Sequence, residues 1–349
     1  MSGSAIGSGS AAELDVAALH GYLQHQGLAG EAATRVKRLT GGQSNPTYLI
    51  DSGDRRYVLR KQPPGKLLPS AHAVDREYRV MSALGAQGIP VPRMYAYCTD
   101  AGVVGTPFYL MEFMDGRILL DPALPGFSTG ERGAIYAEMN RVIAQLHKVD
   151  PVAASLGDFG KPGNYFVRQI TRWTRQYRES GTGTIEAMDA LMEWLPAHIP
   201  SGDETCLVHG DFRLDNLVFD QNEARVIAIL DWELATLGHP LADFSYHCMA
   251  WHIPATLWRG IGGLDLPALG IPTEAQYVEQ YCRKTGREGI AHWDFYIAYN
   301  LFRIAAILQG IAHRALAGNA NADDAVEMGR RARPLAELGW ERAQRTMRH

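Results

Sequence analysis

The apolar pattern of the chain changes once, between about residues 113 and 130, and this change restricts the fold more than any other feature. From Arg35 to Phe113, short β-type runs alternate with turn signals around a single helical stretch. After Gly130, apolar residues recur at helical spacing in several long segments. The chain has 349 residues, which is enough for two parts with separate cores. We therefore expect a small sheet-containing part followed by a larger, mainly helical part.

Three segments follow from this pattern: a tail at residues 1–12, an N-terminal part at 13–113 and a C-terminal part at 114–349. The Gly/Ser/Ala-rich start has neither the basic nor the apolar segment of a signal peptide, so a disordered tail is expected. The N-terminal part is predicted to contain helices at 15–26 and 70–87 and strands at 40–50, 54–61 and 106–116. The C-terminal part is predicted to contain a β-type island at 206–233 and helices at 131–148, 165–179, 185–197, 274–284, 293–316 and from 323 onward.

Composition excludes several classes of protein. The 34 basic and 38 acidic side chains leave a net charge of -4, which gives no surface for non-specific nucleic-acid binding. The four cysteines lie far apart without a C-x-x-C pair, so neither a zinc site nor a disulfide framework is indicated. No apolar run approaches the roughly 18 residues of a transmembrane helix. We expect a cytoplasmic protein without nucleic-acid or membrane partners; the sequence makes no prediction of its oligomeric state.

One charged residue of the N-terminal part lies where an apolar residue is expected. Glu77 falls in the middle of the apolar stripe of the helix at 70–87, and a buried carboxylate needs a cationic partner. Side chains alternate along the strand that ends at Lys61, so only one of Arg60 and Lys61 can face Glu77. We assign Arg60 to this role. A purely structural ion pair that fixes the helix on the sheet is as compatible with the sequence as a ligand-directed pair.

A second set of polar residues lies in the β-type island. Asp211, in the sequence His-Gly-Asp, precedes Asn216 by five residues, and Asp231 ends the next apolar strand. Three oxygen-bearing side chains can therefore meet at one end of two strands. Mg²⁺ is typically held by one or two carboxylates together with substrate phosphates, and a remaining aspartate can accept a proton. A single aspartate is more often a turn or cap residue, so the indication rests on the ordered set.

Several longer segments share a family resemblance. They are GGQSNPTY, YVLRKQPPGKLLPSAHAVDREYRV, HGDFRLDNL, ILDWELATLGHPLADFSY and NLFRIAAILQGI. The chain resembles the aminoglycoside/choline phosphotransferase family, closest to the kinase-like region at the N-terminus of some acyl-CoA dehydrogenases. The resemblance implies an α+β, protein-kinase-like two-lobe fold, with a small antiparallel-sheet N-lobe containing one long helix and a large, mainly helical C-lobe. It also implies an ATP- and Mg²⁺-dependent phosphotransferase that transfers the γ-phosphate to an acceptor hydroxyl.

The resemblance assigns residue roles by position. In the N-lobe, the loop over the ATP phosphates would contain Gly41, Gly42, Ser44 and Asn45. Arg60, paired with Glu77, would contact the phosphates in place of the lysine usual in kinases, and backbone groups of Glu112 to Met114 would hold the adenine.

In the C-lobe, the resemblance makes Asp211 the catalytic base and Asn216 and Asp231 the magnesium ligands. Arg213 would stabilise charge near the transferred phosphate, with an ion pair to Asp215 as the alternative role. Two further residues of the family segments are expected to be structural. His209 would be a buried hydrogen-bonding residue, and Asp243 would cap a helix or brace the catalytic loop.

The local charge of two C-terminal segments indicates which kind of acceptor the protein could bind. Five basic residues and one acidic residue between 159 and 179 give a balance of +4, the basic ones being Lys161, Arg168, Arg172, Arg175 and Arg178. Residues 250–349 carry 12 basic and 10 acidic side chains, so no acidic basin is expected for a polycation. We expect a small-molecule acceptor of an anionic acyl-CoA type, since related kinase-like regions are associated with hydroxyacyl-CoA phosphorylation. A solvated helix face is the alternative reading of the basic residues.

Aromatic side chains of the C-terminal part could line an acyl pocket or belong to the core. They are Tyr165, Phe166, Trp173, Tyr177, Trp251, Trp258, Trp293, Tyr296 and Tyr299. Two alternative functions stay open: a catalytically weak, kinase-like nucleotide-binding module, suggested by Arg60 in place of lysine, and an aminoglycoside or amino-alcohol kinase. A flavin-dependent acyl-CoA dehydrogenase is disfavoured because the kinase-like fold accounts for the chain. A protein kinase is disfavoured because no A-P-E-type segment follows Asp231.

Overall fold

The structure is a computed structural model that describes residues 14–39, 45–65, 72–181, 183–316 and 327–347. It divides the chain into unit 1, Met1–Ser82 with Pro92–Met114, and unit 2, Ala83–Val91 with Asp115–His349. This division differs from the predicted one at residue 113 for Ala83–Val91, which belongs to unit 2. Within unit 2, the Ile229 amide donates to Pro90 O of this segment at 2.8 Å.

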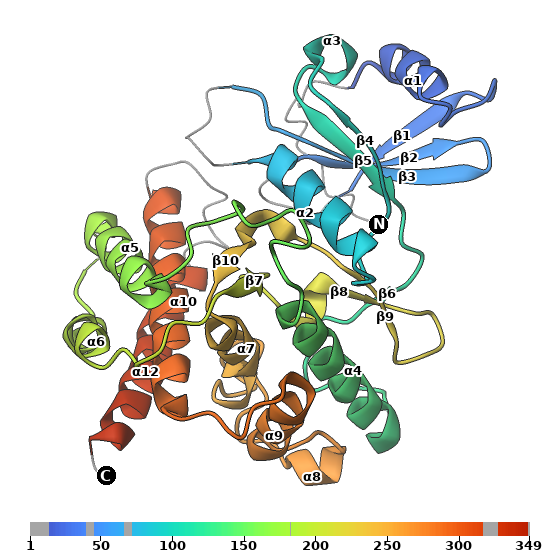
Figure 1. The fold of residues 1–349 in the computed structure, drawn as a ribbon. Helices are drawn as coiled ribbons and strands as arrows, with labels where there is room; N and C mark the ends of the chain where they lie inside the picture. Colours follow the sequence, from blue (N-terminus) through green and yellow to red (C-terminus); the bar gives the residue numbers. More distant parts are fainter. Residues whose placement is uncertain (1–13, 40–44, 66–71, 182, 317–326, 348–349) are drawn as a thin grey trace, which may run out of the picture. The chain divides into compact units, whose positions relative to one another are not determined.

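Unit 1 is built on a five-stranded antiparallel sheet with the strand order β1-β2-β3-β5-β4 (Figure 1). The strands are β1 (Thr34–Arg38), β2 (Thr47–Ser52), β3 (Arg55–Lys61), β4 (Met94–Cys98) and β5 (Phe108–Glu112). Its helices are α1 (Val16–His25), the four-residue α3 (Ala101–Val104) and α2 (Val74–Ala86), whose last residues belong to unit 2. The predicted β2–β3 hairpin and the two longer helices are confirmed, whereas β1 and β4 were not singled out from the sequence.

The core of unit 1 lies between the sheet and α1. Leu19 and Leu23 of α1 are fully buried and belong to one cluster with Ile50, Leu59 and Phe108 of the sheet. The alternation predicted for β3 holds, since Leu59 enters this core while Arg60 lies opposite Tyr109 of β5 on the other face. The register of β3 therefore determines which face of the sheet can meet Glu77.

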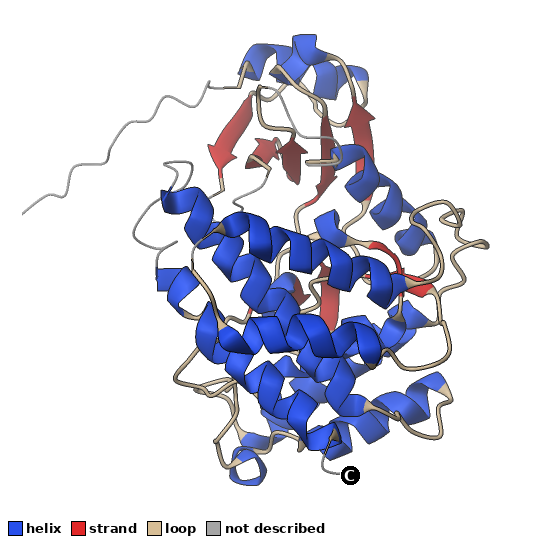
Figure 2. Ribbon diagram, turned by 90° about the vertical axis from the view of Figure 1, so that its left-hand side faces the viewer, coloured by secondary structure: helices blue, strands red, loops and turns tan. Residues whose placement is uncertain are grey.

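Unit 2 consists mainly of helices, as Figure 2 shows. They are α4 (Thr129–His147), α5 (Tyr165–Ser180), α6 (Glu186–Ala197), α7 (Pro240–Cys248), α8 (Leu266–Leu269), α9 (Glu274–Thr285), α10 (Trp293–Leu316) and α12 (Ala332–Thr346). Three 3₁₀ turns accompany them, η1 (Leu214–Asn216), η2 (Trp232–Leu234) and η3 (Met249–Trp251). Helix α7 was not predicted, because all nine of its residues are buried and no polar stripe marks a helical period.

The predicted β-type island forms two small sheets inside unit 2. One pairs β7 (Cys206–Val208) with β10 (Thr236–Gly238), and the other has the order β6 (Arg117–Ile118), β8 (Leu217–Phe219), β9 (Val226–Ile229). The β8–β9 pair is antiparallel, with Leu217 opposite Ile229. The residues just outside this end of the hairpin, Asn216 and Leu230, therefore lie next to each other, and the Leu230 amide donates to Asn216 O at 2.8 Å.

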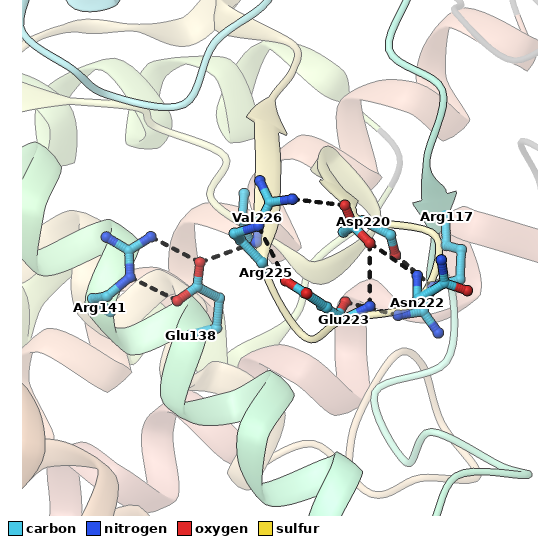
Figure 3. A network of polar contacts seen from close by, with 8 residues as sticks. All are labelled: Arg117, Glu138, Arg141, Asp220, Asn222, Glu223, Arg225 and Val226. Carbon is cyan, nitrogen blue, oxygen red and sulfur yellow. Dashed lines mark hydrogen bonds and ion pairs between the residues drawn. The ribbon is translucent and has the colours of Figure 1, made fainter.

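Polar contacts anchor the far end of this hairpin (Figure 3). Asp220 closes the turn, because Oδ1 accepts the Asn222 amide at 3.0 Å and Oδ2 accepts Arg225 Nη2 at 2.7 Å. Arg117 of β6 donates from Nε to Asp220 O at 2.8 Å. Glu138 of α4 accepts the Val226 amide at 3.0 Å. The hairpin that carries Asn216 and Asp231 is thus attached to both β6 and α4.

Helix α10 contains a stretch, Trp293–Arg314, that is long and apolar enough to cross a membrane, with a mean hydropathy of 1.3. The expectation that no segment reaches this length is wrong for this helix. Its window is 83% buried inside unit 2, where α10 packs along α12 and α5 (Figure 1). Burial on all sides removes the need for a polar stripe, so a core helix has the same composition as a membrane span.

Candidate active site

The loop between β7 and β8 is held by its histidine. His209 is fully buried, and its ring Nε2 lies 2.8 Å from Leu230 O. The Asp211 amide donates to His209 Nδ1 at 3.1 Å, so Nδ1 is an acceptor and the proton is on Nε2. Because both ring nitrogens are engaged within the protein, the imidazole is not available to a substrate. The prediction of a structural, hydrogen-bonded histidine is confirmed.

Asp243 of α7 braces the same loop. Its carboxylate accepts the amides of His209 and Gly210, each at 2.8 Å, and lies 3.2 Å from His147 Nε2. Burial by itself would raise the pKa of Asp243, but the His147 hydrogen bond, the nearby histidines and the loop amide together lower it. Of the two predicted roles, the structure supports the brace; the N-cap of α7 is His239.

The Gly210 peptide is also held from the side of α10. Arg303, which is buried, donates from Nη2 to Gly210 O at 2.6 Å. Its guanidinium lies 4.9 Å from the ring centre of Tyr246 and 5.7 Å from that of Trp173, so the charge rests between aromatic faces. Gly210 has φ 83°, and a Cβ there would lie 2.8 Å from Leu234 O. Both conformation and space therefore require glycine next to Asp211.

The Asp211 carboxylate is bound on both oxygens. Oδ1 accepts the hydroxyl of Tyr246 at 2.5 Å and forms an ion pair with Arg213 Nε at 2.9 Å. Oδ2 accepts Asn216 Nδ2 at 3.0 Å, and the same nitrogen donates to Asp211 O at 2.8 Å. Burial and the adjacent carboxylate raise the pKa of Tyr246, so the phenol stays a donor. The structure thus brings together three predicted residues, Asp211, Arg213 and Asn216.

Asp231 follows β9 at the hairpin end that also carries Asn216. Its backbone has φ 64° and ψ 60°, a left-handed conformation that costs free energy for a residue with a side chain. Such strained positions are typical of functional sites. Asp231 and Asp211 both help to raise the pKa of Asp215, after the larger effect of burial, so the three carboxylates share one electrostatic environment. Asn216 and Asp231 thus lie at the same end of the β8–β9 hairpin, as predicted, and their joint binding of a metal ion stays a prediction.

The donor chemistry of Asn216 and Asp231 fits a hard cation. Asn216 uses Nδ2 on Asp211, so its Oδ1 can be directed to a ligand, and Asp231 supplies a carboxylate. Within the described residues there is no group of three or more His, Cys, Asp or Glu that could form a cage of protein ligands. A two-ligand site is what Mg²⁺ uses when phosphate oxygens and water complete its octahedral coordination.

Arg213 joins the catalytic loop to the segment after α7. Nη1 lies 3.3 Å from Asp215 Oδ2, which is also 3.0 Å from Arg259 Nη1, so the predicted alternative pairing with Asp215 is confirmed. Burial works to lower the pKa of Arg213, but Tyr246, Asp211 and Asp215 raise it above its usual value. Its role in stabilising charge on a transferred phosphoryl group stays a prediction.

A cavity with a volume of about 70 Å³ opens beside this loop, within unit 2. It is lined by the loop residues 212–215, by α4 and by residues 246–259. Of the aromatic residues predicted as pocket candidates, Trp258 is the one in this lining, and the others include core residues such as Phe166 and Tyr299. The sequence reasoning missed Tyr246. Its spacing of three from Asp243 on one helix would have placed both on the same face.

In unit 1, Glu77 forms the predicted buried ion pair. Its carboxylate, in a residue only 1% exposed, lies 3.3 Å from Arg60 Nε and accepts Tyr109 OH and Asn45 Nδ2, each at 2.9 Å. The assignment of Arg60 is confirmed. Lys61 donates instead to Val104 O, and burial lowers the pKa of its ammonium group.

The other predicted nucleotide residues of unit 1 have mixed outcomes. Gly41, Gly42 and Ser44 lie outside the described residues. Asn45 contacts Glu77 and, through Oδ1, His72 Nδ1 at 3.0 Å, so both ends of its side chain are engaged. The Glu112 amide donates to Arg93 O at 2.8 Å, and the adenine contacts of Glu112 to Met114 stay a prediction.

The predicted basic face of α5 is largely solvated. Arg172, Arg175 and Arg178 are exposed, while Arg168 donates to the backbone of Gly163 and, at 2.6 Å, of Lys161. Arg172 lies over the Trp173 ring, 4.8 Å from its centre. These contacts support the solvated-face alternative, and binding of an anionic acceptor there stays a prediction.

Known proteins resemble this chain in sequence and in fold. The model of the phosphotransferase enzyme family matches residues 35–299. A mouse relative, acyl-CoA dehydrogenase family member 10, is 48% identical over 93% of this chain, and the chain spans 31% of that relative's length. A Ralstonia eutropha structure, named provisionally as an aminoglycoside phosphotransferase, is 52% identical with a TM-score of 0.87 and covers 95% of this chain and 99% of its own.

More distant structures share only the fold. Spectinomycin phosphotransferase in complex with ADP and spectinomycin is 11% identical with a TM-score of 0.62, over 93% of this chain and 98% of its own. The expected α+β, kinase-like fold, with an antiparallel-sheet N-lobe and a mainly helical C-lobe, is confirmed. The predicted catalytic aspartate, Asp211, lies next to Asn216, an arrangement that is compatible with transfer of a phosphoryl group. The chain therefore belongs to the phosphotransferase enzyme family.

Proposed function

We propose that this phosphotransferase uses ATP with Mg²⁺ and phosphorylates a hydroxyl group of an anionic small molecule of the hydroxyacyl-CoA type. The observation that carries the proposal is the arrangement around Asp211, whose carboxylate is oriented by Tyr246, Arg213 and Asn216. A base held in this way is ready to receive the proton of an alcohol. Other features of the chain support the nucleotide, the cation and the acceptor separately.

Residue roles in the proposed reaction follow from the contacts. Asp211 holds the acceptor hydroxyl and takes its proton on a carboxylate oxygen. Arg213 supplies positive charge beside that oxygen, and Asn216 and Asp231 hold the cation. When bound, magnesium-ATP supplies the phosphoryl group and neutralises its developing charge. In unit 1, Arg60 is oriented by Glu77 and presents its guanidinium to phosphate oxygens.

The acceptor class is supported by charge and by relatives. Asp215 is the one carboxylate in the lining of the cavity beside the catalytic loop, and it is paired with Arg213 and Arg259. A polycationic aminoglycoside would find no free carboxylate in that lining. The mouse relative is named an acyl-CoA dehydrogenase family member, which favours a CoA thioester as the acceptor. The aminoglycoside alternative is favoured by the name of the Ralstonia eutropha protein.

An acceptor screen tests the proposal. ATP consumption is measured with hydroxyacyl-CoA thioesters, amino alcohols, sugars and aminoglycosides, in wild-type protein and in Asp211→Asn. We expect consumption with hydroxyacyl-CoA that falls at least a thousandfold in Asp211→Asn, while the affinity for ATP is retained. ATP binding without turnover on any acceptor would instead support the nucleotide-binding module. Consumption by the variant at the wild-type rate would remove Asp211 from the mechanism.

A further inference from the structure

The cavity beside the catalytic loop has an apolar interior. Phe212, Met139, Ile253 and Trp258 contribute to its lining, and all lie within unit 2. His247 also lines it, and burial lowers the pKa of this residue to about 4, so the imidazole is neutral at physiological pH. The interior therefore favours a hydrocarbon group over a charged one.

Each arginine of the lining is paired with a carboxylate. Arg213, Asp215 and Arg259 are joined by contacts of 3.3 and 3.0 Å through Asp215 Oδ2, and Arg213 also pairs with Asp211. An anionic group that entered the cavity would find both arginines already engaged by carboxylates. The anionic part of an acceptor is therefore expected to stay outside.

Two residues connect the cavity to the catalytic carboxylate. Tyr246 and Arg213 both contact Oδ1 of Asp211, and both line the cavity. Asn216 contacts Oδ2 and is not part of the lining. A hydroxyl group received by Asp211 on the Oδ1 side consequently has the cavity next to the carbon that bears it.

We infer that this cavity receives the apolar chain of the acceptor on the side of the reacting hydroxyl that is remote from the anionic group. The acceptor is then a secondary alcohol within a carbon chain, with a hydrocarbon tail inside the protein and a charged head outside. A volume of about 70 Å³ limits the tail to a few carbon atoms. This inference rests on the proposed function, because it gives the position of the hydrocarbon tail relative to the hydroxyl group that Asp211 activates.

Variation of tail length tests the inference. The probes are hydroxyacyl-CoA thioesters in which the hydroxyl lies at a fixed distance from the thioester and one to eight carbons extend beyond it. Each added methylene that enters the cavity is expected to raise kcat/KM about fourfold until the cavity is full. Ala250→Leu adds three carbon atoms to the lining and should shift the optimum to shorter tails, with at least a tenfold loss for the longest tail that fits.

Two further variants serve as opposite and control changes. Met139→Ala enlarges the cavity and should shift the optimum to longer tails. Ala137→Leu is the control: it makes the same substitution as Ala250→Leu, but at an exposed position of α4, the helix that carries Met139. Its dependence of kcat/KM on tail length should match that of wild type. The opposite shifts expected of Ala250→Leu and Met139→Ala could not both result from lost stability.

A binding measurement separates this inference from the proposed function. Nucleotide-free protein is titrated with 6,6,6-trifluoro-1-hexanol and followed by ¹⁹F NMR. Broadening with wild type and Ala137→Leu, but not with Ala250→Leu, supports the cavity as the tail site even if no acceptor is phosphorylated. Phosphotransfer that is independent of tail length, or an equal effect of Ala250→Leu on all lengths, overturns the inference and leaves the proposed function standing.

Discussion

Tyr246 donates its hydroxyl hydrogen to Oδ1 of Asp211 at 2.5 Å, although 35 residues separate them in the chain. The bond crosses from α7 to the catalytic loop, and α7 also supplies Asp243, which holds the amides of His209 and Gly210. One buried helix therefore sets both the backbone of the loop and the orientation of its carboxylate.

Tyr246→Phe should lower kcat by about tenfold to a hundredfold with little change in the KM for ATP. Removal of the hydroxyl leaves Oδ1 of Asp211 with Arg213 but without the donor from α7, so the carboxylate should be less well oriented toward an acceptor hydroxyl. Tyr177→Phe is the matched control, because Tyr177 OH accepts a buried amide, that of Ile185, away from the loop. An unchanged kcat in Tyr246→Phe would show that the phenol does not orient Asp211.

Asp243→Asn should destabilise the protein by about 3 kcal/mol and lower kcat, because an amide cannot accept two loop amides and one histidine in the same geometry. Thermal unfolding and turnover measure the two effects. Asp150→Asn is the control: Asp150 also accepts two backbone amides, at 2.8 and 3.3 Å, but is exposed. A loss of stability equal to that of the control would contradict the brace.

Stability should fall between pH 6.5 and pH 4 because of two buried histidines. Burial lowers the pKa of His247 and of His239 to about 4, so the unfolded chain binds more protons than the folded protein in this range. Each residue contributes roughly 3 kcal/mol that is present above pH 6.5 and lost toward pH 4. Melting temperatures measured from pH 4.5 to 8 should depend less on pH in His247→Gln, whereas exposed His25→Gln should resemble wild type.

Substitutions of Arg60 and Lys61, the two adjacent cationic residues of β3, should differ in their effect on ATP affinity. Arg60→Ala leaves the buried Glu77 carboxylate without its guanidinium, so the affinity for ATP should fall at least tenfold, with partial recovery in Arg60→Lys. Lys61→Ala changes the other face of the strand and should affect ATP affinity less than threefold. Calorimetric titration with ATP and magnesium distinguishes the two. Equal losses would argue that the pair only fixes α2 on the sheet.

The magnesium concentration that the activity requires should depend on Asp231, at the end of the β8–β9 hairpin that also carries Asn216. Chelation by EDTA should abolish ATP turnover, and Asp231→Asn should raise the magnesium concentration for half-maximal activity about tenfold. Asp220→Asn changes a carboxylate at the opposite end of the same hairpin and serves as the control. If both variants require the same magnesium concentration as wild type, Asp231 is not a ligand.

Local periodicity accounts for what could be predicted in unit 1. The burial of Glu77 follows from its place on one helix, and the choice between Arg60 and Lys61 is one of strand alternation. Both are properties of a single element. The β2–β3 hairpin and α10 were predictable for the same reason, since a turn signal or a long helical period lies within one short segment.

Features that join distant segments were not predictable from periodicity. Arg303 reaches Gly210 across 93 residues, and within unit 2 the Ile229 amide donates to Pro90 O. Helix α7 gave no helical period because every one of its residues is buried. The sequence pattern indicates which face of a helix or strand is polar, so it gives no information on an element that is buried on all faces.

The sequence alone predicted the family, the two kinds of architecture and the acidic and amide residues that we propose for the chemistry. Only the tertiary structure decided how Asp211 is held, which residues brace its loop, and that an apolar cavity adjoins it. The physical reason is that secondary-structure propensity and side-chain alternation depend only on residues that are close together in the sequence. The orientation of a carboxylate depends instead on donors that packing brings in from helices far along the chain.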